Sequence, residues 1–183
     1  LGKEELNEIE KVFESNWLGR GKQVAEFEYL FSKNLKESSD SFYALSCCTE
    51  GLFMAAKIFN FGPGDEIIVP SISFIAAGSA VVESGAKLVI CDVDKHSLNT
   101  TAEHIKKKIS NKTKAIILNH YGGHPCDMDP IMELANANNI FVIEDSACAV
   151  QSFYKGKACG TIGDMGIWSF DAMKSIVTGD GGM

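Results

Sequence analysis

Residues 140–183 read IFVIEDSACAVQSFYKGKACGTIGDMGIWSFDAMKSIVTGDGGM and contain two short apolar runs, at 140–143 and 167–170. Both runs have the length and composition of buried strands, and the glycine-rich segment between them predicts an irregular connection. The first run ends in two carboxylates, Glu144 and Asp145. A carboxylate directly after a buried strand is itself largely buried and needs a cationic partner. This stretch therefore predicts the end of a sheet with a polar site beside it.

The chain upstream alternates short apolar runs with helical patterns. Predicted strands lie at 42–46, 66–69, 87–91 and 115–118, and predicted helices lie at 49–59, 74–83, 100–109 and 129–138. Strands that alternate with helices of this length are typical of parallel sheets, and uniformly apolar strands indicate that helices cover both faces. The sequence thus predicts an α/β fold of three layers, α/β/α, with a mostly parallel central sheet.

Two of the predicted helices carry start signals. Thr100 and Glu103 have the spacing of a capping box. Asp129 followed by Pro130 has the pattern of an N-cap residue and a first-turn proline. These pairs predict where the two helices begin.

Two amphipathic helical patterns, at 3–15 and 24–35, precede the alternating part of the chain. We expect residues 1–40 to form a helical segment that packs on a larger domain of residues 41–183. Because the chain starts at Leu1 and stops directly after a glycine turn, we also expect it to be a piece of a longer protein.

The composition argues against several classes of protein. The chain has 183 residues, 45% of them hydrophobic, which suits one domain with a sizeable core. A net charge of −7 and a pI near 5.1 argue against a nucleic-acid surface, and no apolar run approaches the ~18 residues of a membrane span. Six cysteines without a CxxC spacing favour reduced thiols in the cytoplasm.

Polar residues gather after the predicted strands, where ligands bind in open α/β sheets. Cys48 and Thr49 follow the first strand and enter a helix, whose free backbone amides could hold a phosphate. Thr49 could equally be a simple helix cap, which is the commoner role. Phe74 follows the second strand and could stack on a planar ring, although core packing is the commoner role for such a residue.

Lys174 follows the run at 167–170 by four residues and precedes a glycine-rich turn at 179–182. A lysine that forms a Schiff base with a cofactor aldehyde needs an acid nearby that keeps the cofactor's pyridine nitrogen protonated. We therefore predict that Lys174 holds pyridoxal 5′-phosphate (PLP) and that Asp145 pairs with the pyridinium nitrogen. A structural salt bridge or a metal would satisfy Asp145 equally well, and Glu144 could share either role.

Residues 120–127, HYGGHPCD, bring two imidazoles, a thiol and a carboxylate together. A zinc site is conceivable, but a loop with glycine and proline fixes no ligand geometry, so we predict no metal. A thiol-redox role for the adjacent pair Cys47 and Cys48 is favoured still less.

Several short motifs, each present once, follow one another in a fixed order along the whole chain. They include Gly62-Pro63-Gly64-Asp65, Asp92-Val93-Asp94, His120-Tyr121-Gly122, Glu144-Asp145-x-Ala147, Ser169-Phe170-x-x-x-Lys174 and Gly179-x-Gly181-Gly182-Met183. In order and spacing they resemble the sugar aminotransferases of the DegT/DnrJ/EryC1/StrS family, whose fold resembles that of aspartate aminotransferase (fold type I).

The resemblance implies a set of cofactor-binding residues. The set comprises Cys48, Thr49, Phe74, Asp145, Cys148, Ser169 and Lys174, with His120 and Tyr121 close by. The amides of Cys48 and Thr49 and the hydroxyl of Ser169 would hold the phosphate, and Phe74 would stack on the ring. Lys174 would be the catalytic residue, both the Schiff-base lysine and the proton shuttle.

The chain departs from the family pattern at three places. The usual Ser-Gly-Thr is CCT at residues 47–49, and the usual Gly-Glu-Gly-Gly is GDGG at residues 179–182. The glutamine usually found three residues after the aspartate is Cys148, which would hold the cofactor's phenol oxygen poorly. These departures affect cofactor contacts and leave the implied chemistry unchanged.

The implied reaction is a PLP-dependent transamination from an amino acid donor, expected to be glutamate, to a keto group of a nucleotide-linked sugar. The alternatives are a PMP- or PLP-dependent deoxysugar dehydrase and a non-catalytic binding module of the same fold. Such dehydrases replace the lysine with histidine, so Lys174 favours the transaminase. The resemblance also implies a homodimer with shared active sites, and we expect no nucleic-acid or membrane partner.

Overall fold

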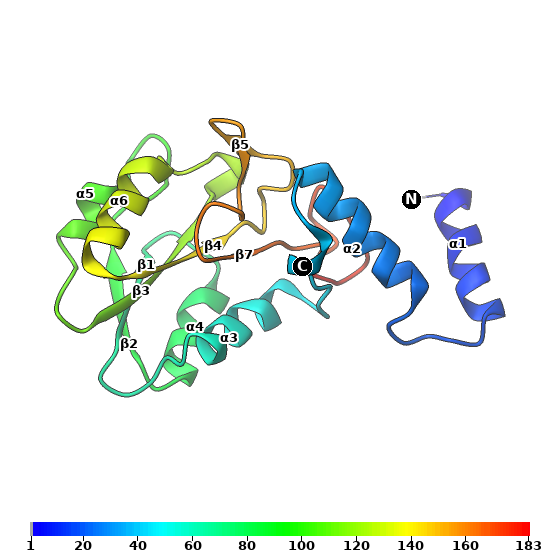
Figure 1. Cartoon of the computed structure of the whole chain (residues 1–183), viewed down its shortest axis with the longest axis horizontal. Helices are drawn as coiled ribbons and strands as arrows, with labels where there is room; N and C mark the ends of the chain where they lie inside the picture. Colours follow the sequence, from blue (N-terminus) through cyan, green and yellow to red (C-terminus); the bar gives the residue numbers. More distant parts are fainter. Residues whose placement is uncertain (1) are drawn as a thin grey trace. The chain divides into compact units, whose positions relative to one another are not determined.

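The computed structural model describes residues 2–183 (Figure 1). The chain divides into two compact units, of which the first ends at Ala44 and the second spans Leu45–Met183. The expected packing of the N-terminal segment on the larger domain stays a prediction. Between residues 2 and 183, no helix is long and apolar enough to cross a membrane.

The first unit is helical, as predicted. It contains α1 (Lys3–Glu14), α2 (Lys22–Leu35) and a short 3₁₀ helix, η1 (Ser39–Ser41). The buried ring of Phe31 on α2 meets the ring of Phe42 edge-on, with centroids 5.9 Å apart. This aromatic contact holds the end of the unit against α2.

The second unit is built on a five-stranded sheet in the order β2-β1-β3-β4-β7, and every neighbouring pair is parallel. The strands are β1 (Glu66–Pro70), β2 (Lys87–Cys91), β3 (Thr113–Asn119), β4 (Phe141–Asp145) and β7 (Met165–Ile167). The helices are α3 (Cys48–Ile58), α4 (Ile75–Glu83), α5 (Ala102–Lys106), the 3₁₀ helix η2 (Tyr121–Gly123) and α6 (Met128–Asn138). A separate antiparallel pair is formed by β5 (Phe153–Tyr154) and β6 (Lys157–Ala158).

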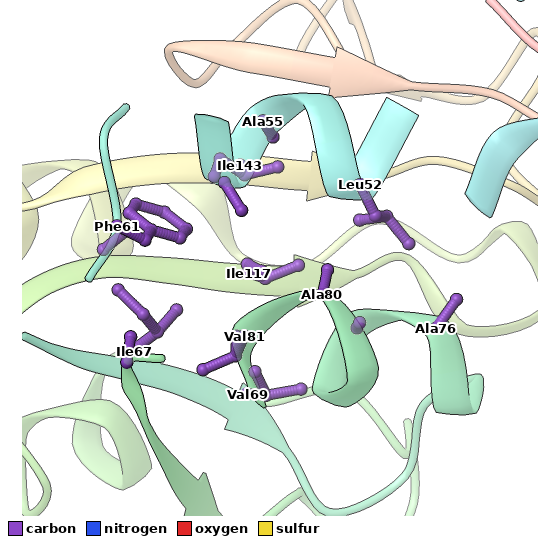
Figure 2. Close-up of a cluster of buried hydrophobic side chains, with 14 of the residues drawn as sticks. Leu52, Ala55, Phe61, Ile67, Val69, Ala76, Ala80, Val81, Ile117 and Ile143 are labelled. Carbon is purple, nitrogen blue, oxygen red and sulfur yellow. The ribbon is translucent and has the colours of Figure 1, made fainter. Parts of the chain in front are cut away.

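Successive residues of the central strands point to opposite faces of the sheet, and each face buries its own apolar cluster. On one face, strand residues pack against Leu52 of α3 and Ala80 of α4 (Figure 2); they are Ile67, Val69, Ile117 and Ile143. On the other face, strand residues pack against Ile105 of α5 and Ile131 of α6; they are Ile68, Ile116, Leu118 and Val142. Figure 1 shows the two helix pairs on opposite sides of the sheet. The predicted three-layer fold is therefore confirmed.

The predicted strand at 42–46 is wrong. Leu45 makes a single antiparallel bridge to Gly182, and the neighbouring residues join no ladder. A strand needs a partner along several residues, and this segment meets one only at Leu45. The apolar run therefore becomes an extended connection into α3.

The last strand was also placed wrongly, because β7 ends where the predicted strand at 167–170 begins. Gly166 lies so close to the backbone of Gly160 that a β-carbon on it would come within 1.9 Å of the Gly160 carbonyl oxygen. A glycine inside a strand marks such a close approach. From sequence alone, this glycine resembled part of the connection.

Both helix-start predictions are off by one or two residues. α5 starts after Thr101, whose hydroxyl accepts a first-turn hydrogen bond, and the predicted cap Thr100 is buried instead. α6 starts after Asp127 rather than after Asp129, and Pro130 still lies in its first turn. Polar residues that are neighbours in sequence compete for the cap position, and short patterns do not separate them.

Candidate active site

The polar residues that follow the strands meet at one edge of the sheet. In the parallel register Asn119 pairs with Asp145, and Asp145 pairs with Ile167, so the carboxyl ends of β3, β4 and β7 are level. Two cavities, of about 390 and 520 Å³, lie at this edge, and Phe74, Asp145 and Lys174 line both of them. The fold therefore brings together an aromatic ring, an acid and a lysine that are far apart in sequence.

All seven residues predicted to bind the cofactor line one of these two cavities. The helix-side cavity, of about 390 Å³, also includes Cys48, Thr49 and Ser169. The loop-side cavity, of about 520 Å³, also includes Cys148, with His120 and Tyr121. Their roles stay predictions.

The start of α3 lines the helix-side cavity and carries unpaired backbone amides. Cys47 is the N-cap, and its sulfur accepts a hydrogen bond from the Glu50 amide at 3.4 Å. The amides of Cys48 and Thr49, the first two of the helix, have no acceptor among residues 2–183, as is usual at helix starts. Amides in this position, with the positive end of the helix dipole behind them, bind phosphate groups.

The glycine-rich turn closes over this helix start. A β-carbon on Gly182 would lie 2.7 Å from the Cys48 amide nitrogen and 2.8 Å from the Cys47 carbonyl carbon, so this position has room only for glycine. Burial raises the pKa of the Cys48 thiol to about 12. Cys48 is therefore a neutral thiol near pH 7, and its backbone amide is the group suited to an anion.

Asp145 is a buried acid that lines both cavities and has one hydrogen-bonded oxygen and one unpaired oxygen. Its Oδ1 accepts a hydrogen bond from the Ala147 amide at 3.1 Å, and no donor between residues 2 and 183 reaches its other oxygen. Burial raises the pKa of Asp145, while the Ala147 amide and the positive charge of Lys174 oppose that rise. An acid in this state is stabilised by any cationic partner that enters the cavities.

Lys174 reaches the same place from the loop after β7. Its backbone amide donates to the Asp171 carbonyl at 2.9 Å, and its Nζ lies 3.4 Å from the Cys148 sulfur. The hydrogen-bond partner of Nζ is thus a thiol and not Asp145, and no ion pair joins Lys174 to Asp145. A thiol is a weak hydrogen-bond partner, so it holds Nζ only loosely at the cavity.

Glu144 has a role that the sequence did not reveal. It lies on the face of the sheet opposite to Asp145, because successive strand residues alternate. It is fully buried, and its oxygens accept hydrogen bonds from the amides of Gly160, Ile162 and Gly163 at 2.6–2.7 Å. Glu144 therefore anchors the loop that leads into β7.

His120 completes this buried cluster. Its Nδ1 accepts a hydrogen bond from the Cys126 amide at 3.0 Å, so the ring hydrogen is on Nε2, which donates to Glu144 at 2.8 Å. Both ring nitrogens are thereby occupied and neither is free to bind a metal. Across residues 2–183, no group of three or more His, Cys, Asp or Glu residues is placed to hold a metal ion.

Asn119 is a second residue that the sequence analysis missed. It ends β3 and lines the loop-side cavity. The only sequence signal was a polar residue at the end of a predicted strand, which also describes many residues that bind nothing.

A parallel sheet of this order, with a lysine and a buried acid at its carboxyl edge, is the fold of the large domain of PLP-dependent transferases. The model of the DegT/DnrJ/EryC1/StrS aminotransferase family matches residues 1–183, and the chain belongs to this family.

Three known proteins illustrate the relationship. The dTDP-4-dehydro-2,3,6-trideoxy-D-glucose 4-aminotransferase of Saccharopolyspora spinosa is 46% identical over 183 residues, which are 100% of this chain and 48% of the relative. The crystal structure of the aminotransferase TlmJ from Streptoalloteichus hindustanus is 49% identical with a TM-score of 0.97, covering 100% of this chain and 50% of that one. The E. coli GDP-4-keto-6-deoxy-D-mannose-3-dehydratase with bound hydrated PLP is 28% identical with a TM-score of 0.89, covering 100% and 48%. The chain thus spans about half the length of the relatives that it matches.

Proposed function

We propose that this protein is a PLP-dependent aminotransferase that moves an amino group from an amino acid, glutamate, to a keto group of a nucleotide-linked sugar. The observation that carries the proposal is that Lys174 and the buried acid Asp145 line the same two cavities. Membership of the aminotransferase family supports the reaction class. The name of the S. spinosa relative, an aminotransferase of a dTDP-linked keto sugar, supports the substrate class, and glutamate is the donor that the family resemblance implies.

The residues of the site fit PLP in three respects. The unpaired amides of Cys48 and Thr49 match a phosphate. The free oxygen of Asp145 matches a protonated pyridine nitrogen, because a buried carboxylate needs a cationic partner. The side chain of Phe74 is 69% exposed and lines both cavities, so it is available to stack on a ring.

When bound, PLP supplies an electron sink for the carbon that carries the donor's amino group. Asp145 favours this function by keeping the pyridine nitrogen protonated, which requires the acid itself to be ionised. With the cofactor bound, the amine of Lys174 would act as general base toward the substrate carbon that carries the amino group, and its ammonium form would act as general acid. The amides at the start of α3 would hold the phosphate and so keep the ring aligned with Lys174 and Asp145.

The proposal is tested on the full-length protein incubated with PLP. We expect an absorbance band from the bond between cofactor and lysine, and borohydride reduction should attach the cofactor to the peptide that contains Lys174. Lys174→Ala should abolish both signals, while Lys157→Ala, which changes an exposed lysine on β6, should keep them. If wild-type protein stays colourless, or if the label is found on another lysine, the proposal is wrong.

The two rival functions give other results in the same preparation. A binding module would form the band without releasing the keto acid of the donor when glutamate and a nucleotide-linked keto sugar are added. A dehydrase would release water from the sugar without gaining nitrogen on it. Mass spectrometry of the sugar product separates the three outcomes, because only transamination adds an amino group.

We further propose that the protein acts as a homodimer with shared active sites and works in the cytoplasm. Beside the cavities, Ile75 is 76% exposed and Met173 is 93% exposed, and a second subunit would cover such apolar side chains. The six cysteines are free thiols, as a reducing compartment keeps them. Sedimentation of the full-length protein tests the dimer.

A further inference from the structure

Cys148 is the one exposed cysteine among residues 2–183, and its thiol lies beside the amine of Lys174. Sγ and Nζ are 3.4 Å apart, and both residues line the loop-side cavity. Across the part of the chain that the structure describes, no other lysine amine lies within hydrogen-bond distance of a cysteine sulfur. Two nucleophilic groups, a thiol and an amine, therefore meet at one accessible point.

The backbone holds this pair in place while the side-chain ends stay free to move. A β-carbon on Gly123 would come within 2.6 Å of the Cys148 carbonyl oxygen, so η2 packs directly against the backbone of Cys148. The Lys174 amide donates to the Asp171 carbonyl at 2.9 Å, which fixes the start of the lysine side chain. Only side-chain torsions then separate sulfur from nitrogen, and a rotation about them can bring the two atoms into bonding distance.

We propose that Cys148 and Lys174 form a peroxide-sensitive modification site that closes to a sulfenamide, a covalent bond between Sγ and Nζ. Hydrogen peroxide first oxidises the thiol to a sulfenic acid: the O–O bond breaks, an S–O bond forms, and water leaves. The neutral amine then attacks the sulfur, the S–O bond breaks, and the hydroxide leaves as water with a proton from the amine. Sulfur has given two electrons to the peroxide, and the pair of side chains has lost two hydrogen atoms. A thiol reductant reverses the bond by attacking the sulfur and releasing the amine.

The cavity also contains a base for the proton that the Lys174 ammonium must lose. Asp145 lines the same cavity, is only 5% exposed, and has an unpaired oxygen. Burial raises the pKa of Asp145, and the positive charge of Lys174 opposes that rise, so the two groups are close enough to interact. A carboxylate in this position can accept the proton and leave the amine nucleophilic.

The other thiols are less suited to this chemistry. Burial raises the pKa of Cys48 and of Cys159 to about 12, so both stay protonated, whereas the thiolate is the form that peroxide oxidises. The Cys47 sulfur accepts a hydrogen bond from the Glu50 amide at 3.4 Å, and no lysine amine within residues 2–183 is bonded to it. Cys148 alone combines exposure with an adjacent amine.

The consequence for the candidate active site rests on the proposed function. An amine that is joined to sulfur cannot bond to the aldehyde of PLP. Borohydride labelling of Lys174 with PLP should therefore fall in proportion to the fraction of joined chains and return after treatment with dithiothreitol.

The test treats the reduced full-length protein, freed of PLP, with hydrogen peroxide at pH 8 and maps its peptides by mass spectrometry. We expect the peptide with Cys148 joined to the peptide with Lys174, at a mass two hydrogen atoms below the sum of both. Dithiothreitol should separate them. Cys148→Ser should abolish the joined product, and Cys47→Ser, at a partly exposed thiol, should keep it. In Lys174→Ala, dimedone should label a sulfenic acid that finds no amine.

Two results would overturn the inference. One is the absence of the joined peptide in the wild type, whether Cys148 stays reduced or is oxidised further to the sulfinic acid. The other is an undiminished yield in Cys148→Ser, because another thiol would then be the partner of Lys174. Both results leave the proposed function untouched, since the joined peptide forms without cofactor. Conversely, a protein that forms it but takes up no PLP when reduced keeps the inference and rejects the proposed function.

Discussion

Replacement of Glu144 by glutamine should destabilise the loop that leads into β7. Its Oε1 accepts bonds from the amides of Ile162 and Gly163 at 2.7 and 2.6 Å, and its Oε2 accepts from the Gly160 amide and His120 Nε2 at 2.7 and 2.8 Å. Glutamine keeps one oxygen and turns the other into an NH₂ group that faces two donors. Two buried donors then lose their acceptor, at about 1–3 kcal/mol each, so Glu144→Gln should cost about 2–6 kcal/mol.

Two measurements check this value. Urea denaturation followed by circular dichroism should show a lower midpoint with an unchanged slope. Hydrogen exchange should accelerate at the amides of Gly160, Ile162 and Gly163, by about 30-fold or more for a local loss of about 2 kcal/mol. Glu133→Gln, on the exposed face of α6, is the control. A loss below about 1 kcal/mol in Glu144→Gln, or exchange as slow as in the control, would refute the reasoning.

Three further predictions follow from the same structure. Burial raises the pKa of Asp145 above its ordinary value of 3.8, so the folded protein without cofactor holds a proton on this acid that the unfolded chain has already lost. The free energy of unfolding should therefore fall as the pH rises through the raised pKa. In Asp145→Asn this fall should be smaller, as urea midpoints measured at a series of pH values can show. Gly166→Ala should cost about 1–3 kcal/mol by urea denaturation, because its β-carbon would meet backbone, whereas Gly62→Ala, with nothing within 4 Å, should be nearly neutral. Iodoacetamide at pH 8 should label the exposed Cys148 and spare the buried Cys159, whose pKa burial raises to about 12, as peptide mass spectrometry can show.

The layered architecture could be predicted from sequence because its signals are strong and repeated. Uniformly apolar strands alternate with helical patterns, and this combination has few solutions other than a parallel sheet between helices. The ends of the strands were less predictable. Gly166 lies in β7 because the backbone of Gly160 packs closely against it, and this contact exists only in the folded chain. Local patterns carry no information about such contacts.

The residues of the candidate site likewise fall into those that the sequence predicted and those that it did not. The location of Lys174 and Asp145 could be predicted because both follow predicted strands, and the carboxyl ends of parallel strands meet at one edge of the sheet. Glu144 was not distinguishable from Asp145 in sequence, although the alternation of a strand puts adjacent residues on opposite faces. Asn119 gave only the weak signal of a polar residue after a predicted strand, and its place in the loop-side cavity is visible only in the folded protein.

The contact between Leu45 and Gly182 has a consequence for how the two sides of the helix-side cavity respond to change. The two residues exchange backbone hydrogen bonds, N to O, at 2.8 and 3.1 Å, so the segment that leads into α3 is tied to the glycine-rich turn. Because Lys174 and the start of α3 line the same cavity, a substitution that moves this turn would disturb both groups together.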